Sequence, residues 1–236
     1  MSYIDGFVVA VPTANREAYL AMARGGQPLF REFGASRMVE AWGDEVPRGK
    51  HNDLYGAVQA GDDETVVFSW IEYPDRTTRD AANGRMISDP RMQALGDMPF
   101  DGQRMIFAGF EPLIDLGSGA AAGYIDGSVA PVPEGNRDAY RQTAEVTAAL
   151  FLEYGAVRVV EAWGDDVADG KRTGFRRATL AGPGEQVVFS WIEWPSKDAR
   201  DSAWARLMED PRMHAVERPF DGSRMMHGGF MPILDA

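Results

Sequence analysis

The chain of 236 residues contains two copies of nearly the same sequence. Residues 3–6 (Tyr-Ile-Asp-Gly) recur at 124–127, and residues 40–44 (Glu-Ala-Trp-Gly-Asp) recur at 161–165, in each case 121 positions later. A spacing this long, with matches this extensive, exceeds the repeat length of solenoid proteins. The sequence therefore indicates a duplicated domain, and the fold must accommodate two similar units.

The two copies stay 121 positions apart as far as residues 89–92 (Asp-Pro-Arg-Met), which recur at 210–213. After this motif the second copy lacks one residue. Each copy is long enough to bury a core of its own. We expect a first domain over 1–115 and a second over 124–236. Residues 116–123, which are mostly Gly, Ala and Ser, are typical of a flexible linker.

Composition excludes several classes of protein. The chain has no cysteine, which excludes disulfides, thiolate nucleophiles and cysteine metal sites, and its three histidines disfavour a haem or multi-histidine metal site. We therefore predict neither a cofactor nor a metal. A formal net charge of −12 with no basic stripe argues against nucleic acid as a partner. No apolar run reaches the ~20 residues of a membrane helix, and no basic leader precedes the first strand, so we expect a cytoplasmic protein.

The hydrophobic periodicity predicts the same order of elements, β-α-β-β-α-β, in each copy. Gly25 and Pro28 interrupt the first helical pattern, so a kink or break is expected near Gly25. In the first copy we predict strands over 3–12, 36–44, 54–73 (broken at 61–63) and 104–110, with helices over 16–33 and 76–92 (stopped or bent at Asp89-Pro90).

This element order is typical of the ferredoxin-like fold, an α+β class in which two helices cover one face of an antiparallel sheet. The other face must also be covered, and the second copy is a ready cover. We therefore predict two ferredoxin-like domains whose sheets pack face to face as an intramolecular dimeric α/β barrel. The first strand presents either Asp5, Phe7 and Val9 or the smaller alternate residues to the interior. Small residues suit close helix packing, which favours the set containing Asp5 as the inward one.

Several motifs recur in the two halves, and in the first copy they are residues 3–12, 40–44, 66–74, 89–92 and 99–105. In these motifs each half resembles the YbaA-like bacterial family of unknown function, along nearly its whole length. The resemblance implies a dimeric α/β-barrel fold, in a superfamily that includes antibiotic-biosynthesis monooxygenases, other small enzymes and haem proteins, and it implies no particular activity. Members of the family usually hold one copy and would pair as homodimers, whereas this chain carries two.

Carboxylates lie among the aromatic residues of the predicted strands, where burial is costly unless the group is paired or its pKa rises. A carboxylate with a raised pKa is suited to act as a general base. The alternative is a structural role, at strand ends in water or in ion pairs with Arg37, Arg104, Arg158 and Arg224. The candidate catalytic residues are Asp5, Glu40 and Glu72 with their counterparts Asp126, Glu161 and Glu193, together with His227.

Aromatic residues of the same strands, with Phe68 and Phe189, are candidates for a pocket that binds a flat organic ligand. The alternative is that they belong to the core. The candidate ligand-binding residues are Trp42, Trp70, Trp163 and Trp191, with Arg104, Arg224 and Ser128.

The residues that differ between the copies indicate a polar pocket in the second half. Phe7 is replaced by Ser128, and Phe107 by His227. The first and last strands of a ferredoxin-like sheet are neighbours, so each pair is expected to touch across strands. The second half would then hold a more polar pocket, with His227 as base or ligand and Ser128 as its hydrogen-bond partner. The alternative is drift at a tolerant surface.

The leading functional hypothesis is a small-molecule enzyme or binder that uses the barrel cavity, with cofactor-free oxygenase or isomerase-like chemistry. It rests on fold analogy. The rival is a non-catalytic module for sensing or protein contacts. A third hypothesis, metal binding by the carboxylates, requires oxygens that converge from several strands. The expected partners are a small-molecule ligand and the other half of the chain, and further oligomerisation stays open.

Overall fold

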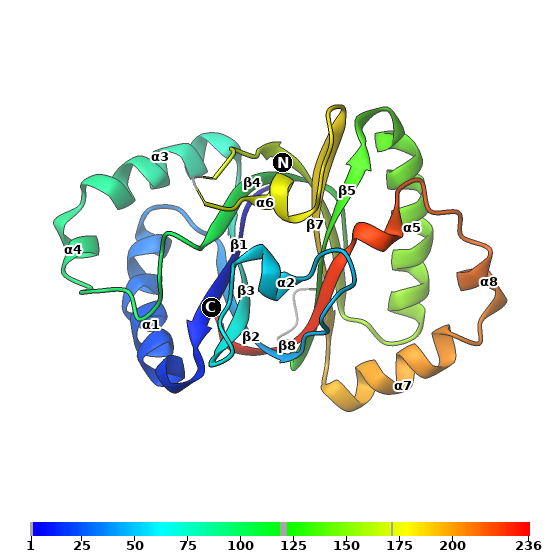
Figure 1. Ribbon diagram of the computed structural model, residues 1–236, viewed down its shortest axis with the longest axis horizontal. Helices are drawn as coiled ribbons and strands as arrows, with labels where there is room; N and C mark the ends of the chain where they lie inside the picture. Colours follow the sequence, from blue (N-terminus) through cyan, green and yellow to red (C-terminus); the bar gives the residue numbers. More distant parts are fainter. Residues whose placement is uncertain (1, 119–121, 171) are drawn as a thin grey trace.

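The structure is a computed structural model that describes residues 2–118, 122–170 and 172–236 (Figure 1). Both halves have the predicted β-α-β-β-α-β order of long elements, with short helices added between them. The first half contains β1 (Tyr3–Pro12), α1 (Arg16–Glu32), β2 (Arg37–Glu45), α2 (Leu54–Ala57), β3 (Glu64–Tyr73), α3 (Arg76–Ser88), α4 (Pro90–Gln93) and β4 (Ile106–Gly117). The second contains β5 (Tyr124–Pro133), α5 (Arg137–Glu153), β6 (Arg158–Asp166), α6 (Phe175–Ala178), β7 (Glu185–Trp194), α7 (Lys197–Leu207), α8 (Pro211–His214) and β8 (Met226–Asp235).

Three local expectations were wrong. Helix α1 continues through Gly25 and Pro28 without a break. The two glycines at 25 and 26 leave room for Leu95, whose Cδ2 would lie 3.3 Å from a Cβ at Gly25. Residues 54–57 form the short helix α2, with the Asp53 side chain capping its N-terminus, so the third strand begins only at Glu64. The last strand of the half, β4, begins at 106 and runs to Gly117, and so enters the expected linker, whose residues 119–121 lie outside the described residues.

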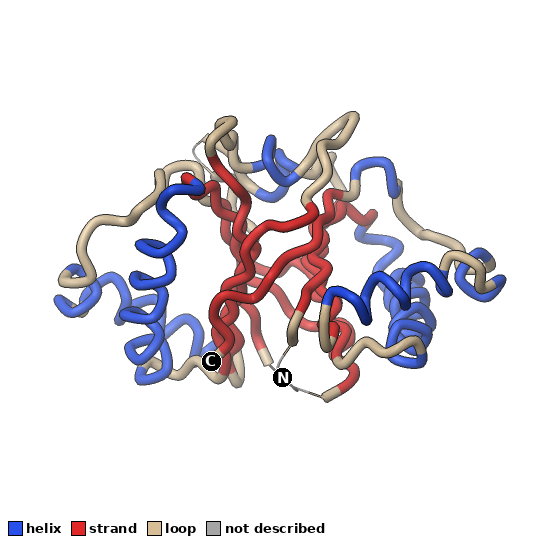
Figure 2. Tube along the Cα trace, turned by 90° about the horizontal axis from the view of Figure 1, so that it is seen from below, coloured by secondary structure: helices blue, strands red, loops and turns tan. Residues whose placement is uncertain are grey.

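The eight strands form one closed antiparallel barrel, in the order β1-β3-β2-β8-β5-β7-β6-β4. Each half contributes four consecutive strands. The edge strand β2 pairs with β8, and β4 pairs with β6, so the two sheets share hydrogen bonds at both seams. In Figure 2 the strands gather at the centre and the long helices flank them on opposite sides. The predicted α+β intramolecular dimeric barrel is confirmed, with the addition that the sheets join edge to edge.

The barrel interior is filled by aromatic side chains from both halves. Phe68 stacks on Phe189 and Trp70 on Trp191, each at a ring-centroid distance of 4.3 Å. All four rings are at most 1% exposed. Because these rings occupy the centre of the barrel, the interior is a packed core, and the expectation of a ligand cavity there was wrong.

The orientation predicted for the first strand was also wrong. Ile4, Val8 and Ala10 belong to the core cluster inside the barrel, whereas Asp5, Phe7 and Val9 face the helices. Small residues are needed inside because large rings cross from the other half. A Cβ on Gly6 would lie 3.0 Å from the Phe110 ring and 3.1 Å from the Phe189 ring. The consequence for function is that Asp5 and Asp126 point toward the layer between sheet and helices.

Candidate functional site

A cavity of about 440 Å³ lies in the second half, between the outer face of the sheet and helices α5 and α7. This volume falls in the range of about 300–1,000 Å³ that is usual for small-molecule sites. The cavity has apolar walls with a few polar groups. It is lined by Asp126, Gly127, Ser128, Tyr140, Thr143, Ala144, Thr147, Phe151, Glu161, Ser190, Trp191, Ile192, Arg200, Trp204, Met213, Val216, Arg218, Phe220, Met225, His227 and Gly228.

Glu161 is the carboxylate of the cavity that has no cationic partner among the residues that the structure describes. The Tyr140 hydroxyl, from α5, donates to its Oε2 at 2.7 Å, and the Ser190 hydroxyl, from β7, donates to the same oxygen. Among the described residues, no donor contacts Oε1. Burial raises the pKa of Glu161 above its usual value, while the two hydroxyl hydrogen bonds lower it by less. One oxygen is therefore fixed in place and the other is available to a ligand.

Asp126 is held by one arginine and two indole N–H groups. Arg200, on α7, donates to Asp126 Oδ1 from Nε at 2.9 Å. The indole Nε1 atoms of Trp194 and Trp204 both donate to Asp126 Oδ2, at 2.9 and 2.8 Å. These bonds hold the α7 side chains against the sheet. Asp126 thus anchors the wall of the cavity, and Trp204 packs edge-on against Phe151 from α5, with the centroids 5.4 Å apart.

Ser128 and His227 are directly opposite one another on the neighbouring strands β5 and β8. Both line the cavity, and His227 is exposed. The corresponding residues of the first half, Phe7 and Phe107, are also cross-strand partners, with their rings stacked at 6.1 Å. The predicted contact between Phe7 and Phe107 is therefore present, whereas Ser128 and His227 are cross-strand neighbours with no side-chain hydrogen bond between them. The cavity lies where the second copy has this smaller and more polar pair.

The first half keeps the framework of this site but has larger apolar residues at several of the lining positions. Tyr19 and Ser69 donate to Glu40 as their counterparts do to Glu161, and Glu40 is 7% exposed. Burial raises the pKa of Glu40 too. Asp5 accepts a bond from Arg79 Nε at 2.7 Å, and burial raises its pKa to about 6. Phe7 and Leu95 occupy positions where the second half has Ser128 and Val216.

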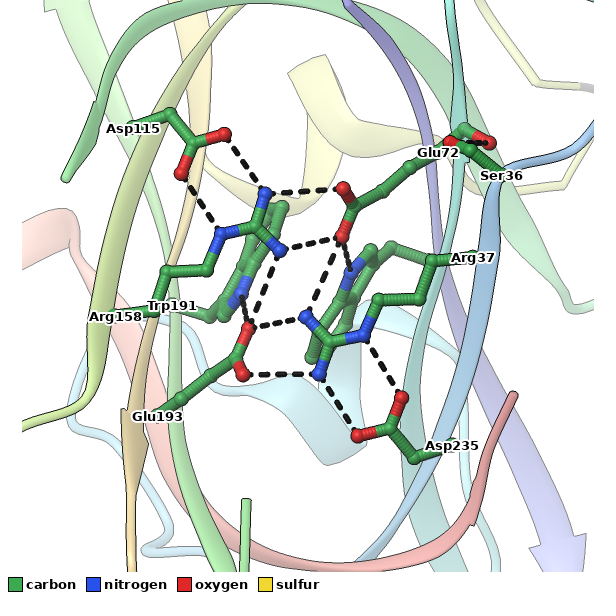
Figure 3. Close-up of polar contacts among 9 residues, drawn as sticks. Ser36, Arg37, Glu72, Asp115, Arg158, Trp191, Glu193 and Asp235 are labelled. Atoms are coloured by element: carbon green, nitrogen blue, oxygen red, sulfur yellow. Dashed lines mark hydrogen bonds and ion pairs between the residues drawn. The ribbon is translucent and has the colours of Figure 1, made fainter. Parts of the chain in front are cut away.

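Glu72 and Glu193 lie at one mouth of the barrel, in an ion network between the halves (Figure 3). Arg158 donates to both oxygens of Glu72, at 2.7 and 3.0 Å, and Arg37 donates to both oxygens of Glu193, at 2.7 and 2.9 Å. The indole of Trp70 donates to Glu72, and that of Trp191 to Glu193. The structural alternative accounts for both carboxylates and for Trp70, whereas Trp191, bound in the same way, also lines the cavity. Neither Glu72 nor Glu193 lines the cavity of the second half.

The remaining candidate ligand-binding residues also have structural partners. Trp42 and Trp163 pack edge-on against Tyr19 and Tyr140, in the layer between sheet and helices, and Trp163 is 8% exposed. Arg104 binds Glu64 through both terminal nitrogens at 2.6 Å, and Arg224 binds Glu185 in the same way at 2.8 and 2.7 Å. Neither tryptophan and neither arginine lines the cavity.

Several residues of the site escaped the sequence reasoning, chiefly Tyr140, Ser190, Arg200 and Trp204. Tyr140 and Ser190 repeat Tyr19 and Ser69 at the same spacing as the glutamates, so their repetition was a usable signal. Trp204 replaces an asparagine of the first copy, and no pattern links it to Asp126, 78 residues away.

Over residues 2–118, 122–170 and 172–236, no group of three or more His, Asp or Glu side chains is placed to hold a metal ion. The converging oxygens that the metal hypothesis requires are thus missing from this part of the chain. In the same ranges, no helix combines the length and the apolar character needed to cross a membrane.

Comparison with known sequences finds the same duplication. A family described as "Protein of unknown function (DUF1428)" matches residues 2–102 and again residues 123–222. The uncharacterized protein YbaA of Escherichia coli (strain K12) is 59% identical over 116 residues, which are 49% of this chain and 99% of YbaA. The protein of the same name from Shigella flexneri matches equally.

Comparison with solved structures finds the same fold at low sequence identity. Two proteins named "putative monooxygenase", from Lactobacillus acidophilus NCFM and Fusobacterium nucleatum, superpose with TM-scores of 0.58 and 0.54 at 11% and 10% identity. The alignments cover 100% and 99% of this chain and 95% and 93% of those chains. An anthrone oxidase-like protein gives a TM-score of 0.53 at 14% identity, over 100% of this chain and 92% of its own.

Proposed function

The chain belongs to the DUF1428 family of proteins of unknown function, and from that starting point we propose that its second half binds a small organic molecule and abstracts a proton from it. The site is the cavity between the sheet and helices α5 and α7. Glu161 is the general base. The observation that carries the proposal is a carboxylate with a raised pKa, held by two hydroxyls in a largely apolar cavity.

The walls of the cavity favour a flat apolar ligand. Phe151, Trp204 and Phe220 offer aromatic surface, and Met213 and Met225 offer adaptable apolar surface. Burial of a ring against such walls supplies affinity without fixing the orientation. The polar groups then set the orientation, because each needs a hydrogen-bond partner once water is displaced.

Proton transfer needs a base in its ionised form and a free lone pair. Glu161 Oε2 accepts from Tyr140 and Ser190, which leaves Oε1 to accept the proton of a ligand C–H or O–H group. That bond breaks, the proton moves to Oε1, and the electron pair stays on the ligand as an enolate or phenolate. Because the pKa of Glu161 is raised, its carboxylate is a stronger base than an exposed glutamate.

Two outcomes follow from such an anion. Return of the proton to a different carbon gives an isomerase. Reaction with dioxygen as co-reactant gives an oxygenase, in which a CH₂ group and O₂ become a carbonyl group and one water. The second outcome agrees with the names of the structural neighbours, although a shared fold alone assigns no activity.

The test is deuterium exchange in an enolisable aromatic ketone. With 2-tetralone in D₂O, NMR should show that the wild-type protein accelerates exchange of the α-protons, and Glu161→Gln should lower that rate by about 10²–10⁴-fold. Glu40→Gln is the matched control in the first half and should keep the wild-type rate. Binding of the ketone without exchange would contradict the catalytic part of the proposal and favour a ligand sensor.

A further inference from the structure

Arg218 lines the cavity and is a cation without a carboxylate partner among the described residues. It differs in this from Arg200, the other arginine of the lining, which binds Asp126 at 2.8 Å and also contacts Glu45 and Asp201. Arg218 is exposed. Other exposed arginines of the described residues, Arg177 among them, also have no ion pair, so the feature that sets Arg218 apart is its position on the cavity wall.

The tandem repeat shows how Arg218 came to differ from the first copy. The second copy lacks one residue in the stretch before the Pro-Phe-Asp-Gly motif, where Gly96-Asp97-Met98 of the first half corresponds to Glu217-Arg218. Arg218 stands directly before the proline of this motif, where the first half has the apolar Met98. This single change of register between the copies falls at the lining of the cavity.

Two other lining positions change in the same direction. Phe7 becomes Ser128, and Phe107 becomes His227. All three replacements exchange an apolar side chain for a hydrogen-bond donor, and all three residues line one cavity. Arg218 and His227 are both exposed, whereas Glu161 is only partly exposed and is held by Tyr140 and Ser190. Arg218 and His227 therefore lie toward solvent, and Glu161 lies deeper in the cavity.

We propose that the ligand of this cavity carries a carboxylate, bound by Arg218 with help from His227, on an aromatic body that lies against Phe151 and Trp204. The inference rests on the proposed function. A guanidinium and a carboxylate form paired, charge-assisted hydrogen bonds, which are stronger and more directional than neutral ones. This arrangement fixes the ring with its acidic C–H or O–H group toward Glu161. The substrate class is thus an aromatic or enolisable carbonyl acid.

The test compares 2-naphthoate with 2-naphthamide, which has the same ring and a neutral group of similar shape, by isothermal titration calorimetry. Wild type should bind the carboxylate at least tenfold more tightly than the amide. Arg218→Gln should remove this preference while leaving amide affinity unchanged, and Arg218→Lys should keep part of it. Arg177→Gln, on α6 and outside the cavity lining, changes the net charge equally and should keep the full preference.

The outcomes separate the two proposals. Equal affinity of wild type for both compounds, or an undiminished preference in Arg218→Gln, would overturn the role of Arg218 and leave the cavity as a binding site. Undiminished binding of both compounds by the double variant Ser128→Phe/His227→Phe would place the ligand elsewhere and overturn the proposed function itself. No binding of either compound to wild type would count against both.

Discussion

Glu40 and Glu161 are chemically equivalent residues whose surroundings differ in access. Each accepts hydrogen bonds from a tyrosine of the long helix and a serine of the third strand of its half. Burial raises the pKa of both. The difference lies in the neighbours: Phe7 closes the first half, and Ser128 opens the second. At the residue scale, the carboxylate is a shared feature and the access to it is specific to one half.

The pKa shift of Glu40 predicts a dependence of stability on pH. A carboxyl group whose folded pKa is raised holds its proton more tightly in the folded state. Its contribution to the free energy of unfolding is full below the unfolded pKa, near 4.5, and is lost as pH rises through the folded value. Urea unfolding from pH 4 to 7 should therefore show a smaller decline for Glu40→Gln than for wild type. A decline of unchanged size would contradict the assigned shift.

Refilling the second half should abolish binding without unfolding the protein. In Ser128→Phe/His227→Phe the two rings should stack across strands β5 and β8, as Phe7 and Phe107 do in the first half, and occupy the cavity. We expect loss of 2-naphthoate binding by calorimetry, with the thermal midpoint unchanged or higher. The reciprocal variant Phe7→Ser/Phe107→His is the control, and it should keep the wild-type affinity. Binding by the filled variant would contradict the location of the site.

At the scale of elements, the ion network joins the strands that close the barrel. Arg37 on β2 reaches Glu193 on β7, and Arg158 on β6 reaches Glu72 on β3, so each pair bridges the two halves. Arg37 also forms an ion pair with Asp235, and Arg158 with Asp115, each with 2.8 Å between Nε and Oδ1. Removal of one partner from a buried pair leaves an uncompensated charge. The network therefore fixes the register in which the two sheets meet.

Glu193→Gln should lower the free energy of unfolding by about 3–5 kcal/mol, the usual cost of breaking a buried ion pair. Glu193 is 0% exposed, and the substitution would leave Arg37 with only Asp235 and a longer contact to Glu72. Urea denaturation measures the effect, with the exposed Glu111→Gln as control. A loss below about 1 kcal/mol would mean that the network contributes little to joining the halves.

The order and kind of elements could be predicted because hydrophobic period, Gly and Pro signal them locally. Which face of each strand is turned to the barrel interior could not be predicted. Small residues such as Gly6 fit equally well under a helix or opposite a large ring, and only the position of Phe189 from the other half decides between the two. The helix at 54–57 was also missed, although Asp53 is a recognisable cap. Local patterns thus predict elements, and contacts between the halves determine which side of an element is buried.

At the scale of the whole molecule, the two halves have the same structure but differ in how accessible their buried glutamate is to a ligand. Aromatic rings of the two halves stack on each other inside the barrel. The first tyrosine of each half donates a hydrogen bond to an aspartate of the other half, Tyr3 to Asp165 and Tyr124 to Asp44. The barrel needs both halves. The open cavity described above belongs to the second. Duplication within one chain permits this division because each copy can then change independently.

One ligand should therefore bind per chain. Calorimetric titration with 2-naphthoate should give a stoichiometry close to one, because Phe7 and Leu95 occupy the equivalent space of the first half. A stoichiometry of two would contradict the assignment of an open site to the second half alone.

Part of the site could be predicted from the sequence. The strand order brings Ser128 beside His227, and the comparison of the two copies singles out both residues. The location of the cavity could not be predicted, because its walls depend on how α5 and α7 lie against the sheet. Trp204 and Arg200 meet Asp126 only through that packing. Likewise, sequence alone does not show that Glu72 and Glu193 are bound by arginines from the opposite half.

The central claim is that the ligand site of this protein is the layer between sheet and helices in the second half. A crystal structure of the protein with 2-naphthoate tests it most directly. We predict one ligand per chain, with its ring against Phe151 and Trp204, its carboxylate on Arg218, and Glu161 within hydrogen-bond distance of the far edge. A ligand among the stacked rings of the barrel, or one bound beside Glu40, would contradict the account.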